Sequence, residues 1–127
     1  MPVAAQVQML QWLLFNTLIG NSNAHAKNLS FLVDARGLRI APLYDLVCGS
    51  VYDHHNIAQS VGGETIFAVI SKAKWMQLAK NCGVPFNLLQ QLTRQLTKQT
   101  DAAQISCLQN PENIAIRHKF NWNSLPK

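Results

Sequence analysis

The sequence predicts one mainly α-helical domain that carries a small β-hairpin. Three segments, residues 7–19, 72–81 and 86–108, space their apolar residues as helices do. Between the first two segments, two short β-prone runs flank a turn that contains glycine. The chain has 127 residues, of which 48% are hydrophobic and 13% are charged. That composition suits one folded domain with its own core.

The first predicted helix covers residues 7–19 and should be mostly buried. Four apolar residues lie on one face at helical spacing, and three more widen that face: Val7, Leu10, Leu14 and Leu18, then Trp12, Leu13 and Phe15. Gly20 follows directly, and glycine commonly ends a helix because it adopts positive φ without strain. A polar loop therefore begins at residue 20.

A hairpin is expected after this loop. Residues 29–33 read as a short buried strand, and residues 38–41 read as the strand that returns. Residues 34–37, with the sequence DARG, form the turn, in which Gly37 is free to take positive φ. Pro42 ends the second strand because it has no N–H to donate to the ladder.

The rest of the chain is expected to begin with a loop and to continue as helices. Its predicted elements are a loop at residues 47–63, a helix capped by Ser71 and ended at residues 81–83, a long helix at residues 86–108, a short helix at residues 112–119 and a tail at residues 120–127. Gly62 and Gly63 are interpreted as a tight turn, because two glycines are too few to cradle a phosphate. Trp75 and Trp122 are interpreted as core or interface residues.

Composition argues against several classes of protein. No apolar run has the length of a membrane-spanning helix, and the first residues lack the basic start of a secretory signal, so we expect a cytoplasmic protein with no membrane contact. The three cysteines, Cys48, Cys82 and Cys107, are widely spaced and odd in number, which favours free thiols. The net charge of +5 fits a nucleotide-facing or an ordinary basic surface. Aromatic and basic residues are little interleaved, so direct nucleic-acid binding is the weakest function considered.

Two motifs flank the predicted hairpin. Residues 20–30 read GNSNAHAKNLS, and residues 42–45 read PLYD. In protein kinases the catalytic base lies five residues before an Asn that holds a metal ion, and a separate Asp holds the other metal ion. Asn23 and Asn28 have that spacing, and the hairpin should bring Asp45 close to Asn28. The side-chain oxygens of Asn28 and Asp45 are hard ligands that suit magnesium. The alternative to a metal site is a structural role, in which Asn28 caps a turn and Asp45 caps the next helix.

These motifs resemble the C-terminal lobe of the HipA-like serine/threonine kinases, the toxins of bacterial toxin–antitoxin systems. That family reads roughly GNxDxHxKNxS, then a short hairpin, then PxYD. Residues 58–63, AQSVGG, are similar to the family's segment after the metal-binding Asp. The resemblance covers residues 8–80 well and the helical tail at residues 86–119 loosely. It implies that residues 1–127 form a single C-terminal lobe of a protein-kinase-like fold, with the N-terminal lobe absent.

The resemblance also implies roles for five residues. Asn23 lies where the family has its catalytic Asp, and Asn28 and Asp45 lie where it has its magnesium ligands. Lys27 would contact a phosphate of ATP, unless it is a solvated loop lysine, and His25 would bond nearby backbone or act in catalysis. The implied reaction is transfer of a phosphoryl group from ATP, bound with Mg²⁺, to a protein hydroxyl. The implied partners are a protein substrate and an antitoxin or a separately encoded N-terminal lobe.

Asn23 is the departure from the family pattern. An amide cannot accept the substrate hydroxyl proton as a carboxylate does, and the loss of a general base typically costs ~10²–10⁴ in rate. The amide can still hydrogen-bond a hydroxyl. The chain could therefore be a pseudokinase, a decaying copy or a protein in which the base has been deliberately replaced.

Two functions follow from these observations. The first is a HipA-like kinase lobe with weak or no catalysis by itself, because nothing before residue 20 can supply the phosphate-covering loop and the upstream lysine of a kinase. The second is a non-catalytic module that binds an antitoxin, an N-terminal lobe or an intact kinase. Apolar surface on the first helix would mediate that contact.

Overall fold

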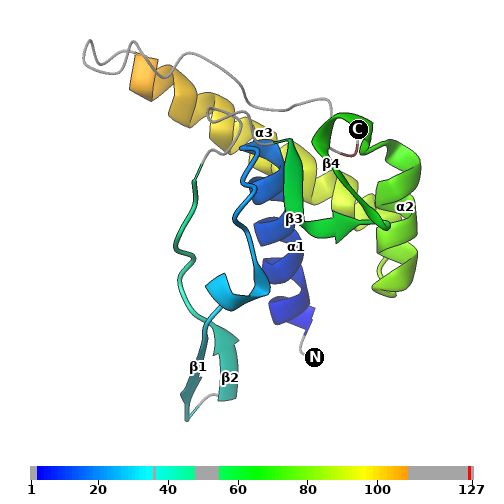
Figure 1. The fold of residues 1–127 in the computed structure, drawn as a ribbon. Coiled ribbons are helices and arrows are strands. Elements are labelled where there is room, and N and C mark those ends of the chain that lie inside the picture. Colours follow the sequence, from blue (N-terminus) through cyan, green and yellow to red (C-terminus); the bar gives the residue numbers. More distant parts are fainter. Residues whose placement is uncertain (1–2, 36, 48–54, 109–125, 127) are drawn as a thin grey trace.

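The computed structural model describes residues 3–35, 37–47, 55–108 and 126, with side chains of the last helix described up to residue 103. Its elements are α1 (Val3–Leu18), η1 (Ala26–Asn28), β1 (Phe31–Asp34), β2 (Gly37–Ile40), β3 (Asn56–Val61), β4 (Glu64–Ile66), η3 (Phe67–Val69), α2 (Lys72–Asn81) and α3 (Phe86–Leu108). Two antiparallel two-stranded sheets, β1–β2 and β3–β4, accompany the helices (Figure 1). The predicted mainly helical fold with a small hairpin is confirmed.

Helix α1 lies at the centre of the hydrophobic core. It contacts α3, β2 and β3, while α2 contacts α3 and β3 (Figure 1). The side chains of Leu14, Leu18 and Trp75 are fully buried, and burial of a large apolar side chain is worth about 1.5–3 kcal/mol. The core cluster consists of Leu10, Leu14, Leu18, Ile57, Val61, Phe67, Ile70, Trp75, Ala79, Leu89 and Leu92.

The helices begin and end close to the predicted residues. Helix α1 begins four residues earlier than expected, at Val3, and its C-terminal half is buried as predicted. Gly20 follows it with a φ of 66°, the left-handed conformation that ends many helices. Helix α3 has the predicted bounds. Ser71 occupies the N-cap position of α2, but its side chain makes no capping hydrogen bond.

The predicted loop at residues 47–63 is wrong over its second part, because β3 and β4 form a hairpin there. Gly62 and Gly63 form the tight turn between them, with φ values of 56° and 81°. Two consecutive positive φ values belong to the two-residue hairpin turns that glycine pairs favour. The strand pattern is weak because the polar Gln59 lies between the two buried residues of β3, Ile57 and Val61, and because the register shifts between Asn56 and Val61.

The first hairpin, β1–β2, forms where predicted, but the expectation that its first strand is buried is wrong. Phe31 is 49% exposed, Val33 is 80% exposed and Leu38 is 59% exposed, whereas Ile40 is buried. The turn end of the hairpin projects away from the helices (Figure 1), so Phe31, Val33 and Leu38 stay uncovered, whereas Ile40 is buried at the end of β2, the strand that contacts α1. The exposed apolar surface expected on α1 therefore lies mainly on this hairpin. It continues along the segment after β2, through Leu43, Tyr44, Leu46 and Val47.

Some predictions concern residues outside the described part of the chain. They are the short helix at residues 112–119, the tail at residues 120–127 with Trp122, of which residue 126 alone is described, and the thiols of Cys48 and Cys107. Cys82, which is described, is a half-buried free thiol. Among the described helices, none is long and apolar enough to cross a membrane.

The turn of the β3–β4 hairpin gives a test of the fold. A Cβ added at Gly62 would meet the carbonyl oxygen of Lys74 in α2, whereas a Cβ added at Gly63 would meet nothing. Gly62→Ala should lower the free energy of unfolding by about 2–5 kcal/mol, because overpacking adds to the strain of positive φ. Gly63→Ala, the matched control, should cost only about 1–2 kcal/mol. Urea denaturation measures both, and an equal cost at the two positions would refute the close contact.

Candidate functional site

Two asparagines and one aspartate meet at the base of the first hairpin. The Asp45 Oδ2 atom accepts hydrogen bonds from Nδ2 of Asn28 at 2.7 Å and from Nδ2 of Asn23 at 3.0 Å. Asn28 and Asp45 are 17 residues apart in sequence. The hairpin brings them together as the sequence predicts, because its strands leave and return at the same end.

Asn28 is fixed by the turn in which it lies. The backbone N–H of His25 donates to the Asn23 carbonyl at 2.7 Å, and the N–H of Asn28 donates to the His25 carbonyl at 2.9 Å. These bonds fold the loop into η1. The buried Asn28 side chain then donates from Nδ2 to the Asn23 carbonyl at 2.8 Å as well as to Asp45. Both amide hydrogens of Asn28 are thus engaged.

Asp45 has an unusual backbone conformation. Its φ is 56°, which lies in the left-handed region. Residues other than glycine rarely adopt this region, although Asp tolerates it better than most. The Asp45 carbonyl oxygen accepts a hydrogen bond from Nδ2 of Asn21 at 3.1 Å. This bond holds the strained residue in place and leaves its carboxylate directed at Asn23 and Asn28.

Asn21 connects the site to the core helix. It is 1% exposed, and its Nδ2 also donates to Oδ1 of Asn16 at 2.7 Å, while its Oδ1 accepts from the Asn23 N–H at 2.9 Å. Asn16 in turn donates to the Trp12 carbonyl within α1 at 2.8 Å. A continuous chain of hydrogen bonds therefore runs from α1 to Asp45.

No role for Asn16 or Asn21 was predicted from the sequence. A signal existed, because Asn16 interrupts the apolar sequence of the first helix, and buried polar groups in folded proteins have partners. Tyr44 was also missed. Its hydroxyl lies 3.0 Å from Oγ of Ser30 and donates to the Lys27 carbonyl at 3.4 Å, which ties the segment after β2 to the start of the hairpin.

The side chains of His25 and Lys27 are exposed. Neither makes a hydrogen bond or ion pair with a side chain in the described part of the chain, and both residues join the network through backbone atoms only. Their suggested roles in phosphate contact and catalysis stay predictions.

The cluster offers oxygen atoms of the kind that magnesium prefers. Oδ1 of Asp45 accepts no hydrogen bond from a described residue, and Asp45 is exposed to solvent. The carbonyl oxygen of the Asn28 side chain is a second hard donor. Asn28 would have to turn its amide to present that oxygen beside Asp45, and would then give up both of its present hydrogen bonds. The donor set therefore fits a magnesium ion, at the cost of part of the network.

Removal of the Asn21 side chain tests the connection to α1. Asn21→Ala should lower the free energy of unfolding by about 2–4 kcal/mol, because the buried Asn16 oxygen and the Asn23 N–H lose their partner. Asn81→Ala removes an exposed asparagine from the end of α2 and should change stability by no more than about 0.5 kcal/mol. Chemical denaturation gives both values. Amide NMR shifts of Tyr44 to Leu46 should change only in Asn21→Ala, and unchanged shifts there would argue against the connection.

Comparison with known proteins places the chain in a family. The family model for the HipA-like C-terminal domain matches residues 1–104. The serine/threonine-protein kinase toxin HipA of Shewanella oneidensis is 40% identical over 90 residues, which are 69% of this chain and 21% of that protein. The putative kinase Y4mE of Sinorhizobium fredii is 30% identical over 117 residues, which are 91% of this chain and 28% of that protein.

A solved structure agrees with these relatives. In the complex of HipA, HipB and operator DNA from the Shewanella oneidensis toxin–antitoxin system, the matching chain superposes with a TM-score of 0.80 at 30% identity. The match covers 90% of this chain and 28% of that one. The chain thus spans less than a third of the length of these relatives. It belongs to the HipA-like C-terminal domain family.

Proposed function

We propose that this chain supplies the magnesium-binding part of a HipA-like serine/threonine kinase, which transfers a phosphoryl group from ATP to a protein hydroxyl. The observation that carries the proposal is the convergence of Asn23 and Asn28 on Oδ2 of Asp45. These residues occupy the positions that the family motif gives to the catalytic base and the two magnesium ligands. The kinase names of the relatives support the same reaction class.

In this proposal Asn28 and Asp45 hold the magnesium ion. When bound, magnesium neutralises charge on the phosphates of ATP and orients them for transfer. Lys27 precedes Asn28 directly in the chain, and its exposed side chain has no described partner, so its ammonium group is available to contact a phosphate. His25, in the same turn, keeps a structural role through its backbone bonds to Asn23 and Asn28.

Asn23 orients a hydroxyl but cannot deprotonate it. Its Nδ2 donates to Asp45, so its Oδ1 stays available to accept a hydrogen bond from a substrate hydroxyl. No proton moves to an amide in that contact. The expected result is positioning without general-base catalysis, and a loss of about 10²–10⁴ in rate relative to an aspartate at this position. On this proposal the chain is a pseudokinase or a strongly impaired kinase.

The second candidate function is a partner-binding module without catalysis. The observation in its favour is the apolar surface on the projecting hairpin, formed by Phe31, Val33 and Leu38. Exposed apolar patches of this kind commonly mark protein contacts. The partner would be the remaining part of a HipA-like kinase, since the chain spans only 21–28% of its relatives, or an antitoxin such as the HipB of the matched complex.

Restoring the acid at position 23 tests the electrostatics of the cluster. In Asn23→Asp two carboxylates would replace a hydrogen-bonded pair now 3.0 Å apart, so we expect a loss of about 1–2 kcal/mol of stability without magnesium. Magnesium should reverse that loss by binding between the carboxylates. Thermal unfolding with and without MgCl₂ measures both effects. Asn81→Asp, an exposed asparagine at the end of α2, is the control, and an equal magnesium response in the two variants would refute a site at Asp45.

Calorimetric titration of Mg·ATP tests the nucleotide site itself. We expect saturable binding to the unaltered chain and to Asn23→Asp, and no binding to Asp45→Asn or in the presence of a chelator. Asn23→Asp should also incorporate more phosphate than the unaltered chain in an autophosphorylation assay.

The other outcomes of this titration are equally informative. No binding to either the unaltered chain or Asn23→Asp would contradict the nucleotide site and favour the second candidate function, the partner-binding module. Robust phosphate incorporation by the unaltered chain would overturn the impaired catalysis that we assign to Asn23.

A further inference from the structure

A recess of the molecule lies between α1 and α2 and shares no lining residue with the Asp45 cluster. Both helices pack against α3 and β3 (Figure 1), and the recess between them has a volume of about 380 Å³. That volume is at the small end of the range for ligand pockets. Its apolar walls include Met9, Trp12, Leu13 and Leu78, and its polar side chains include Gln6 and Gln59.

A hydrogen bond joins the two helical walls of this recess. Nε2 of Gln6, in the first half of α1, donates to the carbonyl of Cys82, which directly follows α2, at 3.0 Å. The two residues are 76 apart in sequence, and both line the recess. The bond therefore holds the end of α2 at a fixed distance from α1, and the recess is kept open by the fold itself.

The chemistry of the lining favours a neutral aromatic ligand. No Asp, Glu, Lys, Arg or His is among the described residues that line the recess. A charged ligand would lose its hydration there without gaining a counter-charge, which is costly. Met9 contributes a thioether and Cys82 a thiol, and contacts between sulfur and an aromatic ring are favourable. Trp12, at 4% exposure, adds a buried aromatic surface.

One amide in the lining is available to a ligand. Gln59 lies between the two buried residues of β3, Ile57 and Val61, and is itself half-buried. Its side chain has no hydrogen-bond partner among the described residues. An amide can both donate and accept. A ligand with one polar group would therefore find a hydrogen-bond partner in an otherwise apolar site, which is the usual composition of a small-molecule site.

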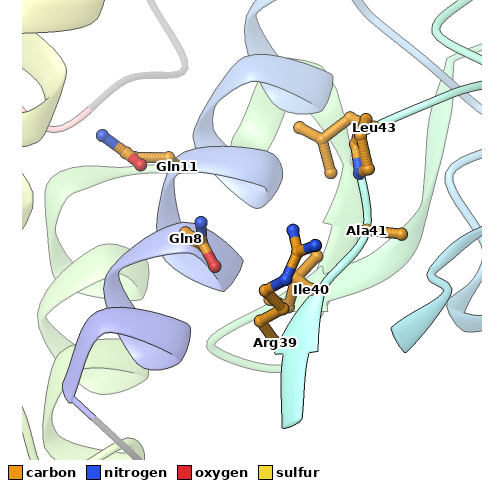
Figure 2. A pocket seen from close by; sticks show the side chains of 7 residues that line it. Gln8, Gln11, Arg39, Ile40, Ala41 and Leu43 are labelled. Atoms are coloured by element: carbon orange, nitrogen blue, oxygen red, sulfur yellow. The ribbon is translucent and has the colours of Figure 1, made fainter. Parts of the chain in front are cut away.

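A different pocket, beside α1 and β2, lacks these properties (Figure 2). The α1 residues that line it, Gln8 and Gln11, are exposed. Its cation, Arg39, is already paired with Asp34 at 3.1 Å. That pocket therefore has a hydrated polar wall on its helix side and a charge that is engaged within the protein, and only the recess between α1 and α2 combines apolar walls with a free polar group.

We propose that the recess between α1 and α2 binds a small, neutral aromatic molecule that carries one hydrogen-bonding group. The ring would lie between Met9 and Leu78, and the polar group would meet the Gln59 amide. A protein partner would need a broad contact surface around the recess, since stable protein interfaces bury about 800 Å² on each partner. None of the large exposed apolar residues in the described part of the chain lines the recess, and most of them lie on the first hairpin and the segment after it. The enclosed site therefore favours a small molecule.

Indole, a neutral planar molecule with one N–H donor, is the probe, and NMR of the methionine methyl groups is the measurement. We expect a saturable shift of the Met9 methyl signal, because the ring current of indole acts on nearby groups, with a Kd on the order of 1 mM. Met76 is exposed on α2 and does not line the recess, so its methyl signal should stay unchanged. N-methylindole should bind about threefold to tenfold more weakly, because it cannot donate to Gln59. Gln59→Leu should remove this difference between the two ligands.

Leu78→Trp fills the recess and should weaken indole binding by about tenfold or more, whereas Met76→Trp adds the same group at an exposed position of α2 and should leave the Kd unchanged. The comparison of the two ligands on the unaltered chain keeps the test valid if Leu78→Trp disturbs the fold. The absence of a saturable Met9 shift, equal shifts of Met9 and Met76, or equal binding of the two ligands would overturn the proposal. A Met9 shift that depends on protein concentration alone would assign the recess to a second copy of the chain and would also overturn it.

Discussion

The hydrogen bond from Asn21 to the carbonyl of Asp45 is the interaction on which the candidate site depends. Asp45 has a left-handed backbone conformation that is unfavourable by roughly 1–2 kcal/mol for a residue with a side chain. Asn21 can hold it because its own side chain is bonded to Asn16, which belongs to the central helix. Leu14 and Leu18 anchor that helix in the core. The position of the carboxylate is therefore set by the core helix through Asn21, as well as by the hairpin that brings Asp45 back beside Asn28.

The amide at position 23 changes what holds this loop together. An acidic residue at position 23 would place its carboxylate within hydrogen-bond distance of the Asp45 carboxylate. The two negative charges would repel each other unless a cation bound between them. The amide of Asn23 instead donates to Asp45, as does the amide of Asn28. The loop is thus closed without a cation, and a metal ion must compete with bonds that already exist. In the proposed site, the amide at position 23 would therefore alter both metal affinity and proton transfer.

Local patterns were enough to predict much of this fold from the sequence. The bounds of α3 follow from a long amphipathic pattern after Pro85, and the closing of the first hairpin follows from Gly37 and Pro42, which also explains why Asn28 and Asp45 meet. The exposure of Phe31 and Val33 could not be predicted, because an apolar strand does not reveal whether another layer covers it. The network through Asn21 joins residues 24 apart, and such tertiary pairings leave no periodic signal.

The first hairpin carries two distinct chemical environments on one short stretch of chain. Ala41 and Leu43 line the pocket beside α1, and Asp45 follows two residues later in the polar cluster. Between them, the Tyr44 hydroxyl contacts Ser30 and the Lys27 carbonyl. Tyr44 and Asn21 therefore support the two sides of Asp45 from different elements, because Tyr44 is bonded to the start of the first hairpin and Asn21 is bonded to α1.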